Sequence, residues 1–163
     1  TEEELRNITF WSLGSLAGSN WWKVCLVFIV VLIGSIRLLS KGKILNALML
    51  GEKEAAHLGF DIEETKREII IIVSLMVGCV VAFNGTIGFV GLVVPYILRF
   101  VFNSNYNILL PLSMLLGAVV MLIADTISRT IVVPAELPIG ILTAIMGAPV
   151  FISILINYKR KLK

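Results

Sequence analysis

The sequence predicts an all-α protein, built as a polytopic membrane bundle of about five transmembrane helices. Hydrophobic residues make up 58% of the 163 residues and charged residues only 15%, whereas soluble domains average about 45–50% and about 25%. The mean hydropathy is +0.96. Five apolar stretches each approach the roughly 20 residues with which an α-helix crosses a hydrocarbon core of ~30 Å. They cover residues 22–39, 69–84, 86–102, 108–124 and 139–157.

The positive charges indicate how these helices are oriented. With the C-terminus on the cytoplasmic side, 11 of the 14 Lys and Arg residues fall in cytoplasmic segments, and the other three are Arg6, Lys23 and Arg129. Cytoplasmic loops carry such an excess, so we expect a multi-pass protein of the cell membrane with an outer N-terminus. Because neither an initiator Met nor a signal peptide precedes that outer end, Thr1 is expected to be a cut end. The pI near 9.0 reflects membrane orientation and not nucleic-acid binding.

The first predicted span follows an acidic helical tail and an outer loop, residues 1–20. Trp21 and Trp22 come directly before the apolar residues, where membrane proteins concentrate interfacial aromatic side chains. Cys25 and Cys79 both fall inside predicted spans. This placement favours buried, inert thiols over a disulfide framework.

Residues 40–67 form the one sizeable polar segment on the expected cytoplasmic side. Apolar residues recur in it at near-helical spacing, and Gly51 and Gly59 each have the character of a helix stop. We expect two short helices, at about 44–50 and 52–58, and Asp61 as a cap leading into the second span. The segment is too polar to cross lipid and too regularly patterned to be only a linker.

The other connections are short. The tripeptide "NGT" separates the second and third spans, and "NSNYN" at 103–107 is expected to be a cytoplasmic turn. The outer connection between the last two spans has Pro134 and Pro138 on either side of Glu136. Glu136 is either a loop residue or the start of the last helix, where a carboxylate is favourable.

Few residues have the character of a reaction centre. The sequence has no Walker A loop, HExxH, paired CxxC or GxSxG motif, and the single histidine, His57, has no second His or Cys nearby. We therefore expect no catalytic residue, metal site or cofactor. Asp125 and Arg129 are four residues apart and share one helix face. Either they form a local ion pair at the helix end, or Arg129 meets an acidic partner at the outer surface.

The third apolar stretch opens with residues that disturb a helix. Gly85, Gly88 and Gly91 precede Pro95, and irregular backbone at membrane depth is tolerated only where protein or a water-filled cavity satisfies its peptide groups. Broken helices of this kind occur in transporters; close helix packing through small residues is the alternative. We expect unwound backbone over Gly85–Gly91 and a helix resuming near Pro95, because a first turn has no N–H partner to lose.

Several motifs taken in order are more specific than any one of them. They are "LGEKEAAHLGF", "GTIGFVGLVVPYILR", "LLPLSMLLGAVVMLIADTISRTI" and "PAELPIGILTAIMGAPVFISIL". Together they resemble the C-terminal half of the permease subunit of the ABC importers that serve iron–siderophores, haem and cobalamin. "FWSLGSLAGSNW" resembles the outer loop before the sixth span of that family. The resemblance covers residues 1–163, which would be the last five of about ten spans.

The resemblance implies partners and site residues. Two permease subunits, alike or different, would pair in the lipid membrane and bind cytoplasmic ABC ATPase subunits, while an extracellular substrate-binding protein delivers the ligand. Arg129 would dock that binding protein, and the glycine-rich stretch would belong to the transport pathway. The residues implied to couple to the ATPase are Leu50, Gly51, Glu52, Glu54, Ala55, Ala56, Gly59 and Phe60.

One position departs from the family pattern. The family usually has His after the proline of "VVP", and this sequence has Tyr96, which keeps an amphipathic ring but does not titrate near neutral pH. Two other function classes remain open. An intramembrane enzyme would need Asp125 or a serine as its catalytic group, and a structural scaffold would not need a patterned cytoplasmic segment.

Overall fold

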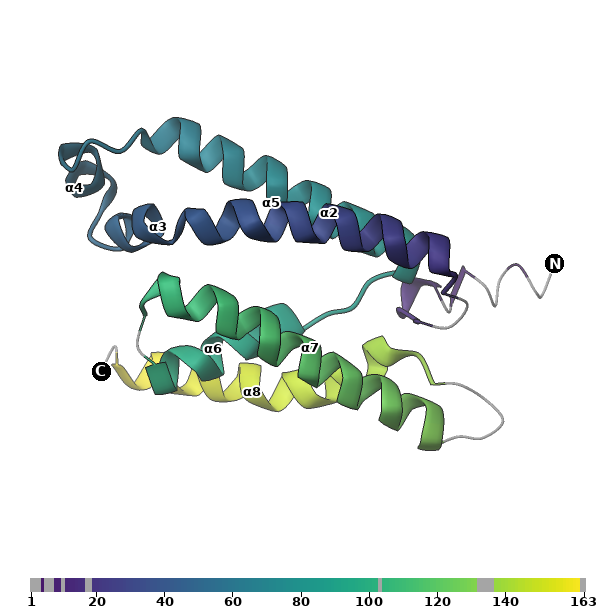
Figure 1. Cartoon of the computed structure of the whole chain (residues 1–163). Helices are drawn as coiled ribbons and strands as arrows, with labels where there is room; N and C mark the ends of the chain where they lie inside the picture. Colours follow the sequence, from purple (N-terminus) through teal and green to yellow (C-terminus); the bar gives the residue numbers. More distant parts are fainter. Residues whose placement is uncertain are drawn as a thin grey trace. The chain divides into compact units, whose positions relative to one another are not determined.

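All regular structure in the described part of the chain is α-helical (Figure 1). The computed structural model describes residues 4, 8–9, 11–16, 19–102, 104–131 and 137–161. The prediction of an all-α protein is confirmed for these residues. Their helices are α2 (Trp21–Ser40), α3 (Gly42–Leu48), α4 (Glu52–His57), α5 (Ile62–Asn84), α6 (Val90–Phe102), α7 (Tyr106–Ile131) and α8 (Ile139–Lys161).

Four of these helices are long and apolar enough to cross a membrane. They are α2, α5, α7 and the first 18 residues of α8. The third predicted stretch is different, because α6 has only 13 residues and begins at Val90 instead of residue 86. Such a helix is too short to cross about 30 Å of hydrocarbon by itself. The described residues therefore contain four helices of full spanning length and one short apolar helix that follows irregular backbone.

The chain divides into two compact units. The α2–α5 unit comprises residues 18–83 and 98–113, and the α8 unit comprises residues 1–17, 84–97 and 114–163. Helices α6 and α7 each contribute one part to each unit. We describe each unit by itself.

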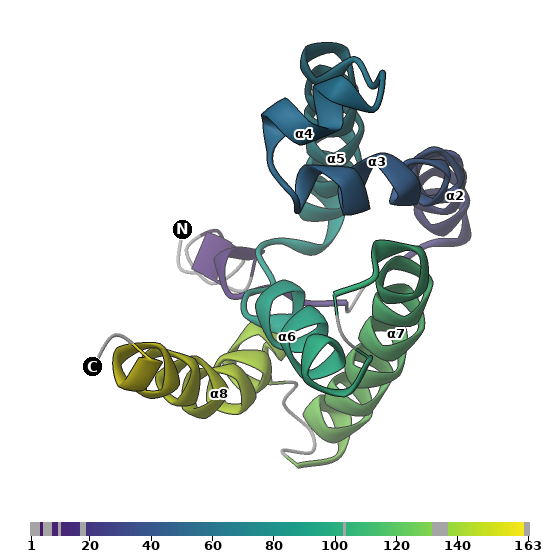
Figure 2. The same ribbon diagram turned by 90° about the vertical axis from the view of Figure 1, so that its left-hand side faces the viewer.

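In the α2–α5 unit, the two long helices run antiparallel and the two short ones lie at one end (Figure 1). Seen from that end, α3 and α4 lie across the ends of α2 and α5 (Figure 2). Gly34 of α2 is buried, and a Cβ added there would overlap the side chain of Met76 on α5. The missing side chain of Gly34 thus lets the two long helices approach closely.

The expected cap at Asp61 is confirmed. The Glu64 N–H donates to Asp61 Oδ1 at 3.0 Å, and the Thr65 hydroxyl donates to the Asp61 carbonyl at 2.7 Å. The Asp61 carboxylate thereby satisfies an N–H group that has no partner within the first turn of the helix. Helix α5 begins at Ile62 for this reason, while still in the polar part of the sequence.

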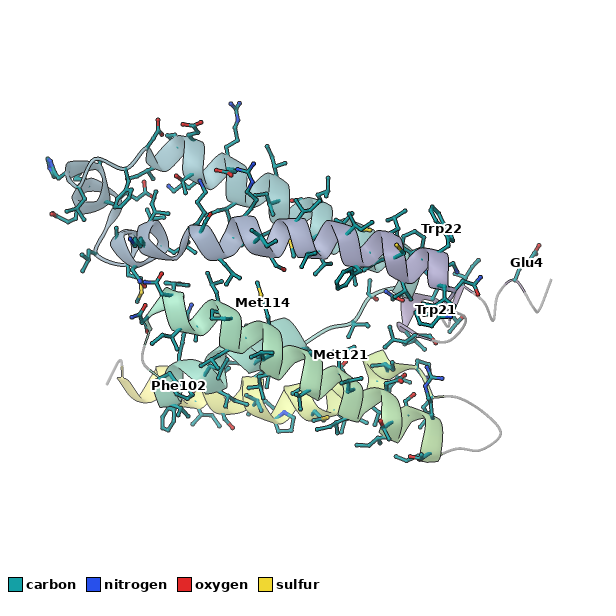
Figure 3. The ribbon with its side chains drawn as sticks, in the orientation of Figure 1. Glu4, Trp21, Trp22, Phe102, Met114 and Met121 are labelled. Atoms are coloured by element: carbon teal, nitrogen blue, oxygen red, sulfur yellow. The ribbon has the colours of Figure 1, made fainter. Side chains whose placement is uncertain are left out.

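The N-terminal end of α2 carries the two tryptophans. Trp21 and Trp22 lie in its first turn and are both exposed (Figure 3). Cys25 and Cys79 lie within α2 and α5 as predicted, but Cys25 is exposed and Cys79 is only half-buried. The prediction of buried thiols is wrong. Both helices carry many exposed apolar side chains, and Cys25 of α2 is exposed among them.

The α8 unit has a small buried core from several helices. Val94 of α6, Ala124 of α7 and Ile139 of α8 are buried. The Ser128 hydroxyl of α7 donates to the Leu137 carbonyl, which ties the end of α7 to the residues just before α8. Glu136, for which the sequence left two readings open, lies outside the described residues.

Pro95 does not occupy the position that the sequence predicted. Helix α6 begins five residues earlier, at Val90, so Pro95 lies beyond the first turn. A proline there removes the N–H that would bond to the carbonyl four residues before it, which belongs to Gly91. Tyr96 follows as a half-buried residue. The prediction that the helix resumes near Pro95 is therefore corrected to a start at Val90.

Candidate functional site

The polar segment between α2 and α5 folds into the two short helices that its pattern predicts. We call residues 41–61 the connector. Its helices are α3 and α4, each within about two residues of the expected bounds. Gly51 joins them with φ 122° and ψ 153°, a conformation that is essentially restricted to glycine. Its carbonyl accepts the first helical bond of α4, from the Ala55 N–H at 3.0 Å.

Helix α4 ends in a complete glycine cap. Gly59 has φ 85°, its N–H donates to the Ala56 carbonyl at 2.9 Å, and the Phe60 N–H donates to the Ala55 carbonyl at 3.4 Å. These two bonds make a Schellman motif, with glycine at the left-handed position. A Cβ added at Gly59 would meet no described atom within 4 Å. The glycine is therefore required by the backbone conformation and not by crowding.

The connector presents apolar side chains on a polar segment. Leu50 is 71% exposed and Leu58 63% exposed, and Met49 beside them is also exposed. Glu54 is exposed as predicted, whereas Ala55 is fully buried at 0%. Of the residues expected to couple to an ATPase, those exposed on the connector are Leu50, Glu52, Glu54, Ala56, Gly59 and Phe60. Gly51 is half-buried.

Ion pairs hold the connector and the ends of the long helices together. Lys66 of α5 pairs with Glu52 at the start of α4. Glu68 of α5 forms ion pairs with Lys41, which follows α2, at 2.5 Å and with Arg37 of α2 at 3.9 Å. Ion pairs this exposed contribute little individually; the Lys66–Glu52 pair joins α4 to α5, and the Glu68 pairs join the end of α2 to α5.

The backbone between α5 and α6 is irregular, as the glycines predict. We call residues 85–89 the glycine segment; none of them is helical. Gly85 ends α5 with φ 72°, and Phe89 has φ 66°, which is uncommon for a residue with a side chain. The Phe89 carbonyl then accepts the N–H groups of Leu92 at 3.0 Å and Val93 at 2.9 Å, so α6 starts after it.

The glycine segment is bonded to a part of the chain that is far away in sequence. The Ser15 N–H donates to the Asn84 carbonyl at 2.9 Å, and the Thr86 hydroxyl donates to the Ser12 carbonyl at 2.6 Å. These bonds provide partners near the helix break, where unpaired peptide groups in a membrane would be unfavourable in free energy. Sequence reasoning missed residues 11–15 as this partner, although the "LGS" of that stretch marks a turn.

Three glycines allow the close approach of these segments. An added Cβ at Gly85 would overlap the Trp11 carbonyl oxygen and lie 3.2 Å from Gly14 Cα. A Cβ at Gly14 would lie 2.5 Å from the Thr86 carbonyl oxygen, and one at Gly140 of α8 would overlap the Leu13 carbonyl oxygen. Three backbones thus meet where only glycine fits.

The other two glycines of the expected unwound stretch have a different environment. Added Cβ atoms at Gly88 and Gly91 meet no described atom within 4 Å, and neither residue has a positive φ. Gly91 also lies inside α6. Of the stretch Gly85–Gly91, residues 85–89 are unwound, and only Gly85 requires glycine for both its conformation and its surroundings.

At the C-terminal end of α7, the local ion pair is present. Arg129 Nε lies 2.9 Å from Asp125 Oδ2, with the two side chains 49% and 24% exposed. This contact restrains the guanidinium and leaves about half of its surface accessible. Among the described residues, no group of His, Cys, Asp and Glu side chains could hold a metal ion.

The whole arrangement is that of a membrane protein with a broken helix and a helical connector. The model of the FecCD transport family matches residues 1–157. The chain belongs to this family.

Named relatives are similar over nearly the whole chain. The vitamin B12 import system permease protein of Vibrio vulnificus is 43% identical over 155 residues, 94% of this chain and 46% of its own length. The molybdate import system permease protein of Haemophilus influenzae is 43% identical over 160 residues, 98% of this chain and 47% of its own length. The chain thus spans about half the length of the curated relatives it matches.

A solved structure shares the fold. It is described as a metal-chelate type ABC transporter in an inward-facing conformation, and it matches with a TM-score of 0.88 and 43% sequence identity. The match covers 96% of this chain and 51% of the solved one. The resemblance to importer permeases that the motifs indicated is confirmed.

Proposed function

We propose that this chain forms part of the permease subunit of an ATP-driven importer, with the connector as its contact with a cytoplasmic ATPase. The observation that carries the proposal is the pair of strongly exposed leucines, Leu50 and Leu58, on the connector at one end of α2 and α5. Apolar side chains outside the membrane are costly to expose and mark a surface that another protein covers. The charge distribution supports a cytoplasmic position for the connector and the C-terminus.

The remaining partners follow from the same proposal. A second permease subunit would complete the pathway across the membrane, and the short helix α6 with its glycine segment would form part of that pathway. Arg129 would meet a carboxylate of an extracellular binding protein, since the guanidinium is half exposed and its fork suits two hydrogen bonds to one carboxylate.

The ligand class of the proposal is a metal-containing compound. Vitamin B12 and molybdate appear in the names of two relatives that each share 43% sequence identity with this chain. The solved structure is of the metal-chelate type. This range is broader than the iron–siderophore, haem or cobalamin that the motifs implied. We therefore propose a metal chelate as ligand, with a metal oxyanion as the second candidate.

The connector contact can be tested with charged substitutions. In the complete permease, Leu50→Asp together with Leu58→Asp should weaken ATPase binding by about 100-fold, because each leucine loses about 1.5 kcal/mol of burial. The measurement is the amount of ATPase subunit that co-purifies with the permease. Ile8→Asp is the matched control, since Ile8 is similarly exposed but lies far from the connector in sequence, in the expected outer tail.

The two results separate the proposal from its alternatives. Normal co-purification of the double variant would exclude the connector as the ATPase contact. ATP-driven uptake by the wild-type complex in proteoliposomes, assayed with cyanocobalamin, haemin, a ferric hydroxamate and molybdate, would then identify the ligand. A complex that imports none of these and binds no ATPase would contradict the importer assignment itself.

A further inference from the structure

A polar side chain of the connector caps a membrane helix that begins 60 residues later. Asn46 lies on α3, and its Oδ1 accepts the Tyr106 N–H at 2.7 Å, at the first residue of α7. Its Nδ2 donates to Asn105 Oδ1 at 3.0 Å. Both ends of one carboxamide are therefore used on the start of α7.

These bonds complete the cap of α7. Asn105 Oδ1 also accepts the Asn107 N–H at 3.1 Å, and the Asn105 carbonyl accepts the N–H groups of Ile108 at 3.1 Å and Leu109 at 2.8 Å. The first N–H groups of a helix have no partner within it. In α7 they are all satisfied, and among the described residues the acceptor of the Tyr106 N–H lies on α3.

Only asparagine fits the position of residue 46 among side chains of this length. The site requires one acceptor, for Tyr106 N–H, and one donor, for Asn105 Oδ1. Aspartate supplies the acceptor alone, and leucine supplies neither. The geometry therefore assigns the orientation of the amide without ambiguity.

The two helices are also in close contact at this point. Gly42 of α3 is buried, and an added Cβ would lie 3.3 Å from Asn107 Cα and overlap the Asn107 side chain. Ile44 and Ala47 of α3 and Leu109 of α7 are buried as well. Contact at this distance leaves α3 little room to move without α7.

The end of α6 is joined to the same place. Arg99 donates to the Tyr106 hydroxyl at 2.9 Å, and its guanidinium carbon lies 5.6 Å from the centre of the Tyr106 ring. Tyr106 thus contacts α3 through its backbone and α6 through its side chain. We call Asn46, Arg99, Asn105 and Tyr106 the α7 junction.

We propose that the α7 junction makes α3 and the start of α7 move as one body, so that displacement of the connector shifts α7 and, through Arg99, the end of α6. Asn46 is then a positioning residue for coupling. The inference rests on the proposed function, in which an ATPase displaces the connector. The bonds carry this displacement to the membrane helices, because a capped and closely packed helix end follows the group that caps it.

The first experiment uses the complete complex with Cys25→Ser and Cys79→Ser, and with Ile108→Cys as an exposed reporter on α7. The rate of maleimide labelling at residue 108 is measured with and without ATP and vanadate. We expect nucleotide to change the rate about five-fold or more and Asn46→Ala to remove most of that change in the complexes that retain the ATPase. Asn46→Asp should retain part of it, because the Tyr106 bond survives.

Asn20→Ala is the matched control, since Asn20 precedes α2 at the other end and makes no side-chain cap. An equal nucleotide response in Asn46→Ala and Asn20→Ala would overturn the inference, as would the absence of any response in the parent. A purely structural role would reduce the yield of both states and leave the response of the surviving complex unchanged. Failure of ATPase binding in the parent would instead contradict the proposed function.

The second experiment does not depend on removing Asn46. In the same cysteine-replaced background, Gly42→Cys with Asn107→Cys allows α3 and α7 to be joined by a disulfide, given the closeness of these positions. If the two helices move together, the joined complex keeps its vanadate-sensitive labelling response at residue 108. Loss of the response on oxidation and its return on reduction would show that the helices must separate, which would overturn the inference.

Discussion

The connector and the glycine segment both interrupt long helices with glycine, yet they do so under opposite conditions. In the connector, Gly51 and Gly59 have left-handed or glycine-only backbone, and added Cβ atoms there would meet no described atom within 4 Å. In the glycine segment, Gly85 also has positive φ, but it lies directly against the Trp11 carbonyl and Gly14. Gly51 and Gly59 are therefore needed for their backbone conformation alone. Gly85 is needed both for its backbone conformation and because no side chain fits beside Trp11 and Gly14.

The difference reflects where the freed peptide groups find partners. The glycine cap of α4 is completed by residues five or fewer positions away, Ala55 and Ala56. At the glycine segment, the preceding Asn84 bonds to Ser15 and Thr86 bonds to Ser12, both far away in the sequence. An interruption in a polar segment can thus be local, while one between apolar helices needs another part of the protein.

The largest expected effect separates the two kinds of glycine. Gly85→Val should destabilise the folded complex by about 3 kcal/mol, from about 1–2 kcal/mol for the left-handed backbone and about 1–3 kcal/mol for overpacking against Trp11. Gly88→Val is the control, because an added Cβ at Gly88 meets no described atom within 4 Å and its φ is not positive. The measurement is the fraction of complex that stays monodisperse by size-exclusion chromatography after heating. Equal loss in both variants would contradict the distinction.

A smaller effect is expected for the connector, and it should appear in coupling more than in stability. Gly59→Ala strains the left-handed cap by about 1 kcal/mol, and combining it with Glu54→Ala alters the exposed face of α4. The double variant should still receive ligand from the binding protein but should transport less per ATP hydrolysed. Gly78→Ala in α5 is the control, since Gly78 is helical and uncrowded. An unchanged ratio of uptake to ATP hydrolysis would remove the connector from the coupling step.

The smallest expected effect concerns Arg129, which tests whether the C-terminal end of α7 also contacts a protein. Arg129→Glu should slow docking of the binding protein, more at low than at high salt, because exposed charges act mainly on encounter and are screened. The partly exposed pair with Asp125 accounts for at most about 1 kcal/mol of stability. Surface-plasmon measurements at two ionic strengths would check this, with partial rescue by an Arg in place of the partner's carboxylate. Normal docking at low salt would leave Arg129 as the local partner of Asp125.

Much of this protein is determined by local sequence. The helical class, the long spans, the two short helices and the Asp61 cap follow from hydrophobic spacing and from capping residues that act within one turn. The ion pair of Asp125 with Arg129 follows from a spacing of four residues. In each case the interacting groups are a few residues apart, so the pattern of the sequence contains the contact.

Only the tertiary structure determines the features that depend on contacts between residues far apart in the sequence. The sequence marked Gly85, Gly88 and Gly91 alike, but only Gly85 lies against residues 11–14, and only the folded chain brings that stretch beside it. Asn46 has no local signal as a cap, because its acceptor and donor belong to α7, 60 residues away. Helix α6 begins at Val90 and not near Pro95 because the Phe89 carbonyl accepts its first bonds. Spacing along a chain predicts which side chains share a helix face. It does not predict which distant backbone will form hydrogen bonds with the peptide groups freed where a helix is interrupted, because those partners meet only when the segments pack.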